Sequence, residues 1–302
     1  MGTMAVAPSF WPLLVGFALY GVGAGPVALT ADVVVLESFP TDPDRAYSRA
    51  SVLDTCGALL GPASVALALS AGLSWRVVLV ATAVAVGLYA WAASRATFPP
   101  PPRSRRDGES VLGALVSGLR SALHHPEIRR ALLVLLAFDV FEAGFVLQYI
   151  WLHDDVGLSE PVVALWAVGE HVVGLVALLV LDRWLSDRLP LRILRAATAA
   201  LVVLPAAWIA APGVAGKVVV GVPLASATAI VWPLAKARSL TVAPELAGAT
   251  QAVTTLYPVL PLALVEGGLA SAIGTGPAMA VTAAVGAALM LALTLRCPRD
   301  RS

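Results

Sequence analysis

Charged residues are scarce in this chain, and their scarcity limits its class. Only 13% of the 302 residues are charged, whereas a soluble globular domain has roughly 25%. Hydrophobic residues make up 59% of the chain, and the mean hydropathy is +0.85. The composition therefore predicts a protein that crosses a membrane many times.

Several residue patterns are missing, and each absence excludes a class of function. The two cysteines, Cys56 and Cys297, cannot form a disulfide framework or a metal site. The chain has no G-x-x-x-x-G-K-[ST] loop, so ATP is not expected to drive it directly. No converging nucleophile or metal set marks an enzyme, and no basic face marks a nucleic-acid binder. No cofactor is expected.

Long apolar segments fill most of the sequence. A bilayer core about 30 Å thick needs about 20 apolar residues for each spanning helix. By that measure we predict an all-α, polytopic membrane protein with nine transmembrane helices. They cover residues 10–38, 48–71, 75–97, 128–152, 161–183, 191–211, 215–242, 247–273 and 276–296.

Arginine is concentrated in alternate connections between these segments. The stretch 95–130 carries seven arginines and four consecutive prolines, which is typical of a cytoplasmic linker under the positive-inside rule. If the chain crosses alternately on either side of it, only Arg76 and Lys217 fall outside, which leaves eighteen of the twenty basic residues inside. We therefore predict a cytoplasmic C-terminus and an outer Met1. Because residues 1–9 contain no Lys or Arg, no cleavable signal peptide is predicted.

The linker separates two unequal parts. Residues 1–98 hold three predicted spans, residues 99–127 form the linker, and residues 128–302 hold six spans. The linker also contains apolar residues at helical spacing, namely Val111, Leu115, Leu119 and Leu123. They predict a short amphipathic helix, which is either bound at the inner membrane surface or a solvated connector.

Two pairs of glycines predict close packing between helices. Gly21 with Gly25, and Gly57 with Gly61, have the small-xxx-small spacing that lets helix backbones approach in lipid. Packing of this kind replaces the hydrophobic effect as the attraction between helices inside a bilayer. The first two spans are therefore expected to contact their neighbours tightly.

Four motifs, spread across most of the chain, resemble the major facilitator superfamily. Residues 14–25 resemble the glycine-rich fourth helix of that family, and residues 57–62 resemble the G-x-x-x-G-P motif of its fifth helix. Trp75-Arg76 resembles the start of the sixth helix, and residues 187–192 resemble the inner D-R-x-G-R-R loop. The nine spans would then match family helices four to twelve. The first three would be missing, through either a late start codon or a true truncation.

The resemblance implies a secondary active transporter that carries a small organic molecule by alternating access. Proton coupling, export rather than import, and a monomer in a bacterial plasma membrane are expected. The implied gating and conformational residues are Asp187, Arg188, Arg192, Gly57, Gly61 and Pro62. The alternative is an N-terminally truncated membrane protein that transports nothing.

The chain also departs from the family pattern. Phe17 stands where the fourth helix often carries an arginine, so proton coupling through that position is not implied. Val65 and Ala66 stand where a glycine pair is usual, which argues against the drug-antiporter subgroup. Pro190 replaces a glycine of the loop motif.

Asp139 and Glu142 are the first candidates for binding a proton or the substrate. They lie three residues apart in the fourth span and share nearly one helix face. Each charge at mid-bilayer costs about 2.5–3.5 kcal/mol, which favours an orientation toward the protein interior. By the resemblance, this span matches family helix seven, which lines the central path. The alternative is an acidic pair that only bonds to neighbouring helices.

Other polar and aromatic residues inside the spans are further candidates. Glu170 and His171 lie midway along the fifth span, and Glu266 lies in the outer part of the eighth. A histidine and carboxylates in a helix bundle can form a proton relay or merely local hydrogen bonds. Trp232 precedes Pro233, which is expected to bend the seventh span and place an aromatic surface by the path.

Two tyrosines and three acidic residues complete the candidates. Tyr149 and Tyr257 are aromatic residues that could line the same path. Asp32, Glu37 and Asp54 lie near the inner ends of their spans, where solvation is easy, so no functional role is predicted for them. No metal site is predicted from any of these residues.

Overall fold

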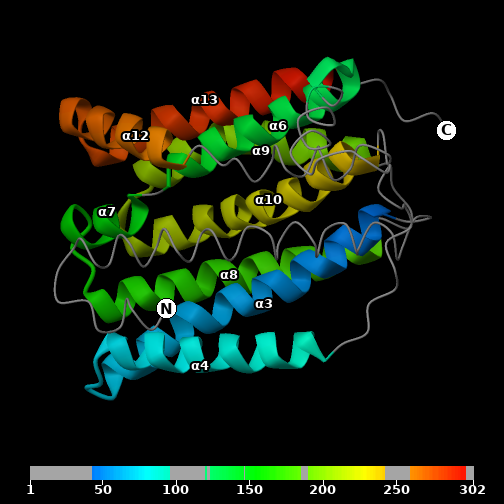
Figure 1. Cartoon of the computed structure of the whole chain (residues 1–302). Helices are drawn as coiled ribbons and strands as arrows, with labels where there is room; N and C mark the ends of the chain where they lie inside the picture. The colour runs from blue at the N-terminus through cyan, green and yellow to red at the C-terminus, as the bar shows by residue number, and fades with distance from the viewer. Residues whose placement is uncertain are drawn as a thin grey trace.

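The computed structural model describes residues 43–95, 120, 123–145, 147–184, 190–241 and 259–296. Every regular element within these residues is a helix, and none is a strand. The helices are α3 (Pro43–Ser70), α4 (Trp75–Ser94), α6 (Pro126–Ala143), α7 (Gln148–Asp154), α8 (Glu160–Trp184), α9 (Pro190–Ala210), α10 (Gly213–Thr241), α12 (Val259–Ile273) and α13 (Thr275–Leu295). Figure 1 shows that the long helices lie side by side and alternate in direction.

The predicted all-helical membrane architecture is confirmed for the described residues. Six helical segments there are long and apolar enough to cross a membrane, and α4 and α12 contain two shorter apolar stretches. These make eight segments, where nine spans were predicted. The first predicted span, residues 10–38, lies outside the described residues, and the predicted eighth span is described only from Val259 onward.

The fourth predicted span, residues 128–152, falls within one apolar segment of membrane length, Pro126–Asp154, in which the structure divides the helix into α6 and α7. At the end of α6 the backbone N–H of Gly144 donates to the carbonyl of Phe141, so the hydrogen-bond spacing tightens from four residues to three. Hydropathy cannot reveal such a change, because both halves of the segment are apolar. The second helix starts at Gln148 and turns Gln148 and Tyr149 toward the bundle interior.

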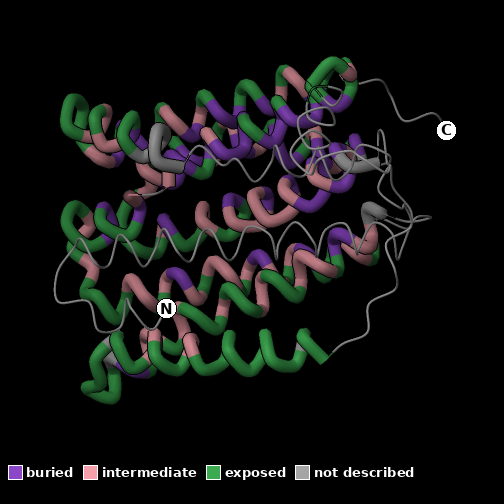
Figure 2. The backbone as a smooth tube through the Cα atoms, viewed as in Figure 1, coloured by how far each residue is buried: buried purple, intermediate pink, exposed green. Residues whose placement is uncertain are grey.

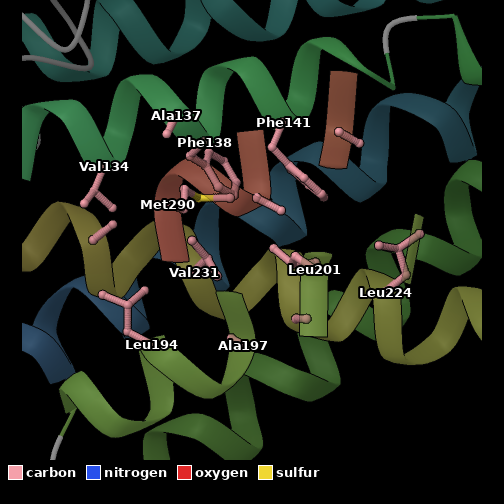
Figure 3. Packing of buried hydrophobic residues seen from close by; sticks show 14 of the residues in the cluster. Val134, Ala137, Phe138, Phe141, Leu194, Ala197, Leu201, Leu224, Val231 and Met290 are labelled. Carbon is pink, nitrogen blue, oxygen red and sulfur yellow. The ribbon is translucent and has the colours of Figure 1, made fainter. Parts of the chain in front are cut away.

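The packed core lies among the C-terminal helices. Helix α13 packs between α6 and α9, while α10 packs on α9 and α8, and α3 packs on α8. Buried positions follow α6, α9, α10 and α13, whereas α4 is largely exposed (Figure 2). In the cluster of Figure 3, Phe138 of α6 lies beside Met290 of α13, Phe141 lies further along α6, and Val231 of α10 is nearby. This cluster fixes the position of α6.

Lys217, counted above with the outer connections, lies within α10 and is only 6% exposed. Its Nζ donates to the carbonyls of Ile209 and Ala211, at 3.1 and 3.2 Å, where α9 ends. Nζ also lies 4.5 Å from the centroid of the Trp151 ring, within the range of a cation–π contact. A positive charge is favourable at a helix C-terminus, so Lys217 caps α9 and ties it to α7 and α10.

Many of the described basic residues lie at one end of the bundle. Arg45 and Arg49 near the start of α3 reach Asp182 at the end of α8. Arg195 in α9 donates to the carbonyl of Thr294 near the end of α13. Because the helices alternate in direction (Figure 1), these ends are the ones that the loop charges assign to the inner side. The alternate crossing agrees with the prediction, while the orientation in a membrane stays a prediction.

Candidate functional site

A cavity of about 760 Å³ lies between α3, α6, α7, α8 and α10. The ionisable side chains in its wall are Asp54, Asp139, Glu142, Glu170 and His171. The aromatic side chains in its wall are Phe138, Phe141, Phe145, Tyr149 and Trp232. The cavity therefore brings together five of the six residues that the sequence suggested for proton or substrate binding, and Glu266 is not among them.

Asp139 and Glu142 face this cavity from successive turns of α6. Asp139 is only 6% exposed, and no described residue makes a hydrogen bond or an ion pair with its carboxyl group. Glu142 lies one turn further along and is more exposed. Because two negative charges one turn apart repel each other, the pair favours the presence of a proton or another positive group between them.

Glu170 of α8 receives several hydrogen bonds. Its Oε1 accepts one from Trp166 Nε1 at 2.8 Å. Its Oε2 accepts one from Gln148 Nε2 at 2.9 Å and one from the Tyr149 hydroxyl at 3.3 Å. Trp166 lies one turn earlier on α8, whereas the other two donors belong to α7. The carboxylate of Glu170 therefore joins α7 to α8 at the cavity wall.

His171 is held by its own helix. Its Nδ1 lies 2.7 Å from the carbonyl oxygen of Ala167, one turn earlier in α8. Because a carbonyl oxygen can only accept, Nδ1 must carry the hydrogen, which leaves Nε2 of the neutral ring as a hydrogen-bond acceptor.

Aromatic rings form much of the remaining wall. The ring centroid of Phe138 lies 5.5 Å from that of Trp232 and 6.0 Å from that of Phe141. The Phe141 and Phe145 centroids are 5.4 Å apart. These separations lie within the about 4.5–7 Å typical of interacting ring pairs. Trp232 therefore lies in the cavity wall, next to Phe138 of α6, while its place by a transport path stays a prediction.

Glu266 lies apart from the cavity. It is fully buried on α12, where its Oε2 accepts a hydrogen bond from Thr282 of α13. Its Oε1 has no hydrogen-bond partner among the residues that the structure describes. The sequence predicts how deep in a span Glu266 lies, and on that basis it was grouped with the other polar residues. The sequence does not predict whether Glu266 faces the cavity, because that depends on how the helices pack.

The expected gate is described only in part. Asp187 and Arg188 lie outside the described residues, and Arg192 is an exposed residue near the start of α9. The conformational roles of Gly57 and Pro62, which lie inside the continuous helix α3, stay predictions.

Among the described residues, close helix contact occurs at Gly144 and Gly286, whereas the predicted pair Gly21 and Gly25 lies outside the described residues. A Cβ added at Gly57 or Gly61 would meet no described atom within 4 Å. A Cβ at Gly144 or Gly286 would instead lie within 3 Å of the facing backbone of α13 or α6. The tightest glycine-mediated approach among the described helices is therefore between α6 and α13.

An ion pair that the sequence did not reveal connects α3 to α8. Nε of Arg45 and Nε of Arg49 lie 3.1 and 3.3 Å from Oδ1 of Asp182. In the sequence Arg45 and Asp182 are 137 positions apart, so only the fold could pair them. The sequence shows only that two basic residues lie near the start of one helix and an acidic residue near the end of another. The pair holds the two helices together at the end of the cavity nearest the basic connections.

Asp182→Asn is expected to open this end of the cavity to solvent more often. An exposed ion pair contributes about 0.2–1 kcal/mol, so its loss shifts an open–closed equilibrium by at most about fivefold. The measurement uses Ser51→Cys, which places a thiol in the cavity wall, in a chain carrying Cys56→Ser and Cys297→Ser. Its labelling by a membrane-impermeant maleimide in inside-out vesicles should become up to about fivefold faster.

Asp182→Glu is the matched control, because it keeps the negative charge at the same position. Its labelling rate should stay near that of the parent chain. If Asp182→Asn leaves the labelling rate unchanged or slows it, the contact between α3 and α8 does not restrict access from this end.

The family comparison matches most of the chain. A family model described as Major Facilitator Superfamily matches residues 1–257. This region includes every helix that lines the cavity, from α3 to α10. No curated protein matches this chain.

Proposed function

We propose that this chain, which belongs to the major facilitator superfamily, carries a small organic molecule across the membrane by alternating access coupled to protons. The family assignment confirms the resemblance drawn from the sequence motifs. Members of the family are membrane transporters of small molecules. The substrate class, the coupling ion and the direction are the parts that belong to the proposal.

One observation carries the proposal, namely that the cavity lies where α3 meets α8 and α10. In the predicted division, α3 belongs to residues 1–98, while α8 and α10 belong to residues 128–302. Rocking of one bundle against the other about such a site would expose it to each side in turn. The volume of about 760 Å³ suits a small organic molecule, since ligand pockets usually measure about 300–1,000 Å³.

Asp139 and Glu142 supply the proposed proton site. A carboxylate at membrane depth is costly, and such residues commonly belong to ion pathways. Uptake of a proton on one side and its release on the other would couple the two bundles to the proton gradient. Glu170 and His171, on the facing helix α8, would extend the site as a relay.

Direction and topology complete the proposal. The largely apolar and aromatic lining favours export of an amphipathic molecule over uptake of a polar nutrient. The loop charges support a nine-span arrangement that matches family helices four to twelve, with the C-terminus in the cytoplasm of a bacterial cell. We propose that the chain acts as a monomer in the plasma membrane.

The test is transport by the purified 302-residue chain in proteoliposomes under an imposed pH gradient. The probes are fluorescent organic compounds of positive, neutral and negative charge. At least one probe should move faster with the gradient than without it, and Asp139→Asn and Glu142→Gln should each abolish this difference. Both substitutions keep the size of the side chain but remove the ability to exchange a proton.

Glu127→Gln serves as the control, because Glu127 is exposed in the first turn of α6 and does not line the cavity. It should keep the gradient effect. Transport that ignores the gradient in the unsubstituted chain would reject proton coupling. If no probe moves at all, transport of such compounds is rejected, and the non-transporting membrane protein that the sequence left as the alternative is favoured.

A further inference from the structure

We propose that the molecule carried in this cavity is an organic cation with apolar or aromatic substituents. The inference rests on the proposed function, because it names the substrate class of the same site. Three features of the cavity wall support it: the charges of its side chains, its aromatic rings, and the hydrogen-bonding groups that are already engaged within the protein.

The charge of the cavity wall is negative. Four carboxylates line it, whereas no lysine or arginine does so among the described residues. Of the basic residues described near the cavity, Arg45 and Arg49 contact Asp182, and the Lys236 ammonium lies 5.2 Å from the ring centroid of Trp232. A positive ligand would therefore be attracted into the cavity, and an anion would be repelled.

Asp139 is the group most in need of a positive partner. Its side chain is more than nine-tenths buried, it faces the cavity, and no described residue donates a hydrogen bond to it or pairs with it. A buried polar group without a partner is costly, and a buried charge more so. A ligand cation would provide the missing partner, and Glu142, one turn away, would add to the attraction.

The aromatic rings make the second half of the site. The face of an aromatic ring attracts cations, with tryptophan the strongest. Trp232 lines the cavity, and the Lys236 ammonium already lies 5.2 Å from its ring centroid, so this ring accommodates a positive charge in the fold. Phe138 of α6 and Phe145, just after α6, extend the apolar wall, where hydrocarbon or ring substituents of a ligand would pack.

Four of the polar side chains in the cavity wall already donate hydrogen bonds within the protein, which leaves fewer donors for a neutral sugar or an amide. Thr55 and Thr228 donate to carbonyls one turn back in their own helices. Gln148 and Tyr149 donate to Glu170. Neutral polar ligands need several available hydrogen-bonding groups, so recognition by charge and ring faces is the arrangement that this wall offers.

The experiment compares two probes of nearly equal size and opposite charge, tetraphenylphosphonium and tetraphenylborate. Each is titrated separately into the full chain in lipid nanodiscs, at one fixed pH and without a gradient, and empty nanodiscs give the background. Tetraphenylphosphonium should bind at least about tenfold more tightly than tetraphenylborate. The negative charges of the cavity attract the first probe and repel the second. Equal binding, or tighter binding of the borate, would overturn the inference.

Side-chain substitutions locate the binding. Asp139→Asn and Glu142→Gln should each weaken tetraphenylphosphonium binding by about tenfold, while Glu127→Gln should leave it unchanged. Trp232→Leu should weaken it more than Trp232→Phe, which keeps an aromatic face. If Asp139→Asn fails to fold, the inference is still tested by the comparison of the two probes in the parent chain and by tetraphenylphosphonium binding to Glu142→Gln. Unchanged binding in all the folded cavity variants would refute the site.

The outcomes separate this inference from the proposed function. Binding is measured at equilibrium, so it does not depend on proton coupling or on completion of the transport cycle. Charge-selective binding without gradient-driven transport would leave the cation site standing and reject the coupling. Gradient-driven transport of neutral or anionic probes, together with charge-blind binding, would keep the transporter and reject the cation.

Discussion

Gly286→Ala is expected to prevent α13 from packing on α6 and to lower the yield of folded protein sharply. A Cβ built at Gly286 would lie 2.6 Å from the Cα of Phe141 and 2.8 Å from the carbonyl oxygen of Ala137. Both are backbone atoms, so the clash can be relieved only by moving a whole helix. Overpacking a tight core costs about 1–3 kcal/mol, and a clash with backbone belongs at the upper end of that range. Thermal unfolding of the detergent-purified protein, followed by size-exclusion chromatography, measures the loss.

Gly169→Ala is the matched control. Gly169 is also helical, on α8, and a Cβ there would meet no described atom within 4 Å. Alanine restricts the unfolded chain, so stability should stay unchanged or rise by about 0.4–1 kcal/mol. Equal melting temperatures for the two variants would mean that α6 and α13 are not in backbone contact at Gly286.

The contact at Gly286 marks one limit of reasoning from the sequence. The small-xxx-small rule selected Gly57 and Gly61, whose surroundings are open among the described helices. The same spacing occurs at Ala283 and Ala287 of α13, and both are fully buried. The rule identifies helices that are able to approach closely. It cannot name the partner helix, because that depends on the packing of the whole bundle.

The helices themselves could be predicted because their signals are local. Apolar runs of membrane length and arginines in alternate connections are both properties of a short stretch of sequence. Asp139 could be selected from the sequence because a carboxylate in an apolar span is costly to insert, which favours a position that faces the protein interior. The interruption between α6 and α7 gave no such signal, because an apolar sequence fits a broken helix as well as a continuous one.

Other members of the site could not be read from the chain. Asp54 was assigned to a solvated helix end, and it is exposed on α3, but it also lines the cavity wall. Gln148 and Trp166 carry no charge, so a search for ionised groups in apolar spans did not select them. Only the start of α7 after the interruption brings Gln148 Nε2 within 2.9 Å of Glu170. Such partnerships depend on tertiary structure, and they decide what a candidate residue does.

Glu170→Leu is expected to destabilise the contact between α7 and α8 strongly. Leucine would leave Trp166 Nε1 and the amide of Gln148 without an acceptor, while the more exposed hydroxyl of Tyr149 could turn to water. Each donor left unsatisfied costs about 1–3 kcal/mol, so the loss of the acceptor for two donors should lower the free energy of unfolding by about 2–6 kcal/mol. The measurement is the melting temperature of the purified variant at one fixed pH.

Glu170→Gln separates the hydrogen bonds of this position from its charge. The amide oxygen of glutamine can still accept from Trp166, which can only donate, while its NH₂ group can donate to Tyr149 or to a reoriented Gln148 amide. Glu170→Gln should therefore melt close to the parent chain, although it lacks the negative charge. If Glu170→Gln is instead as unstable as Glu170→Leu, the charge itself holds α7 to α8. If both variants melt like the parent, the three hydrogen bonds do not stabilise the bundle. The role of Glu170 would then be to interact with a ligand or a proton in the cavity.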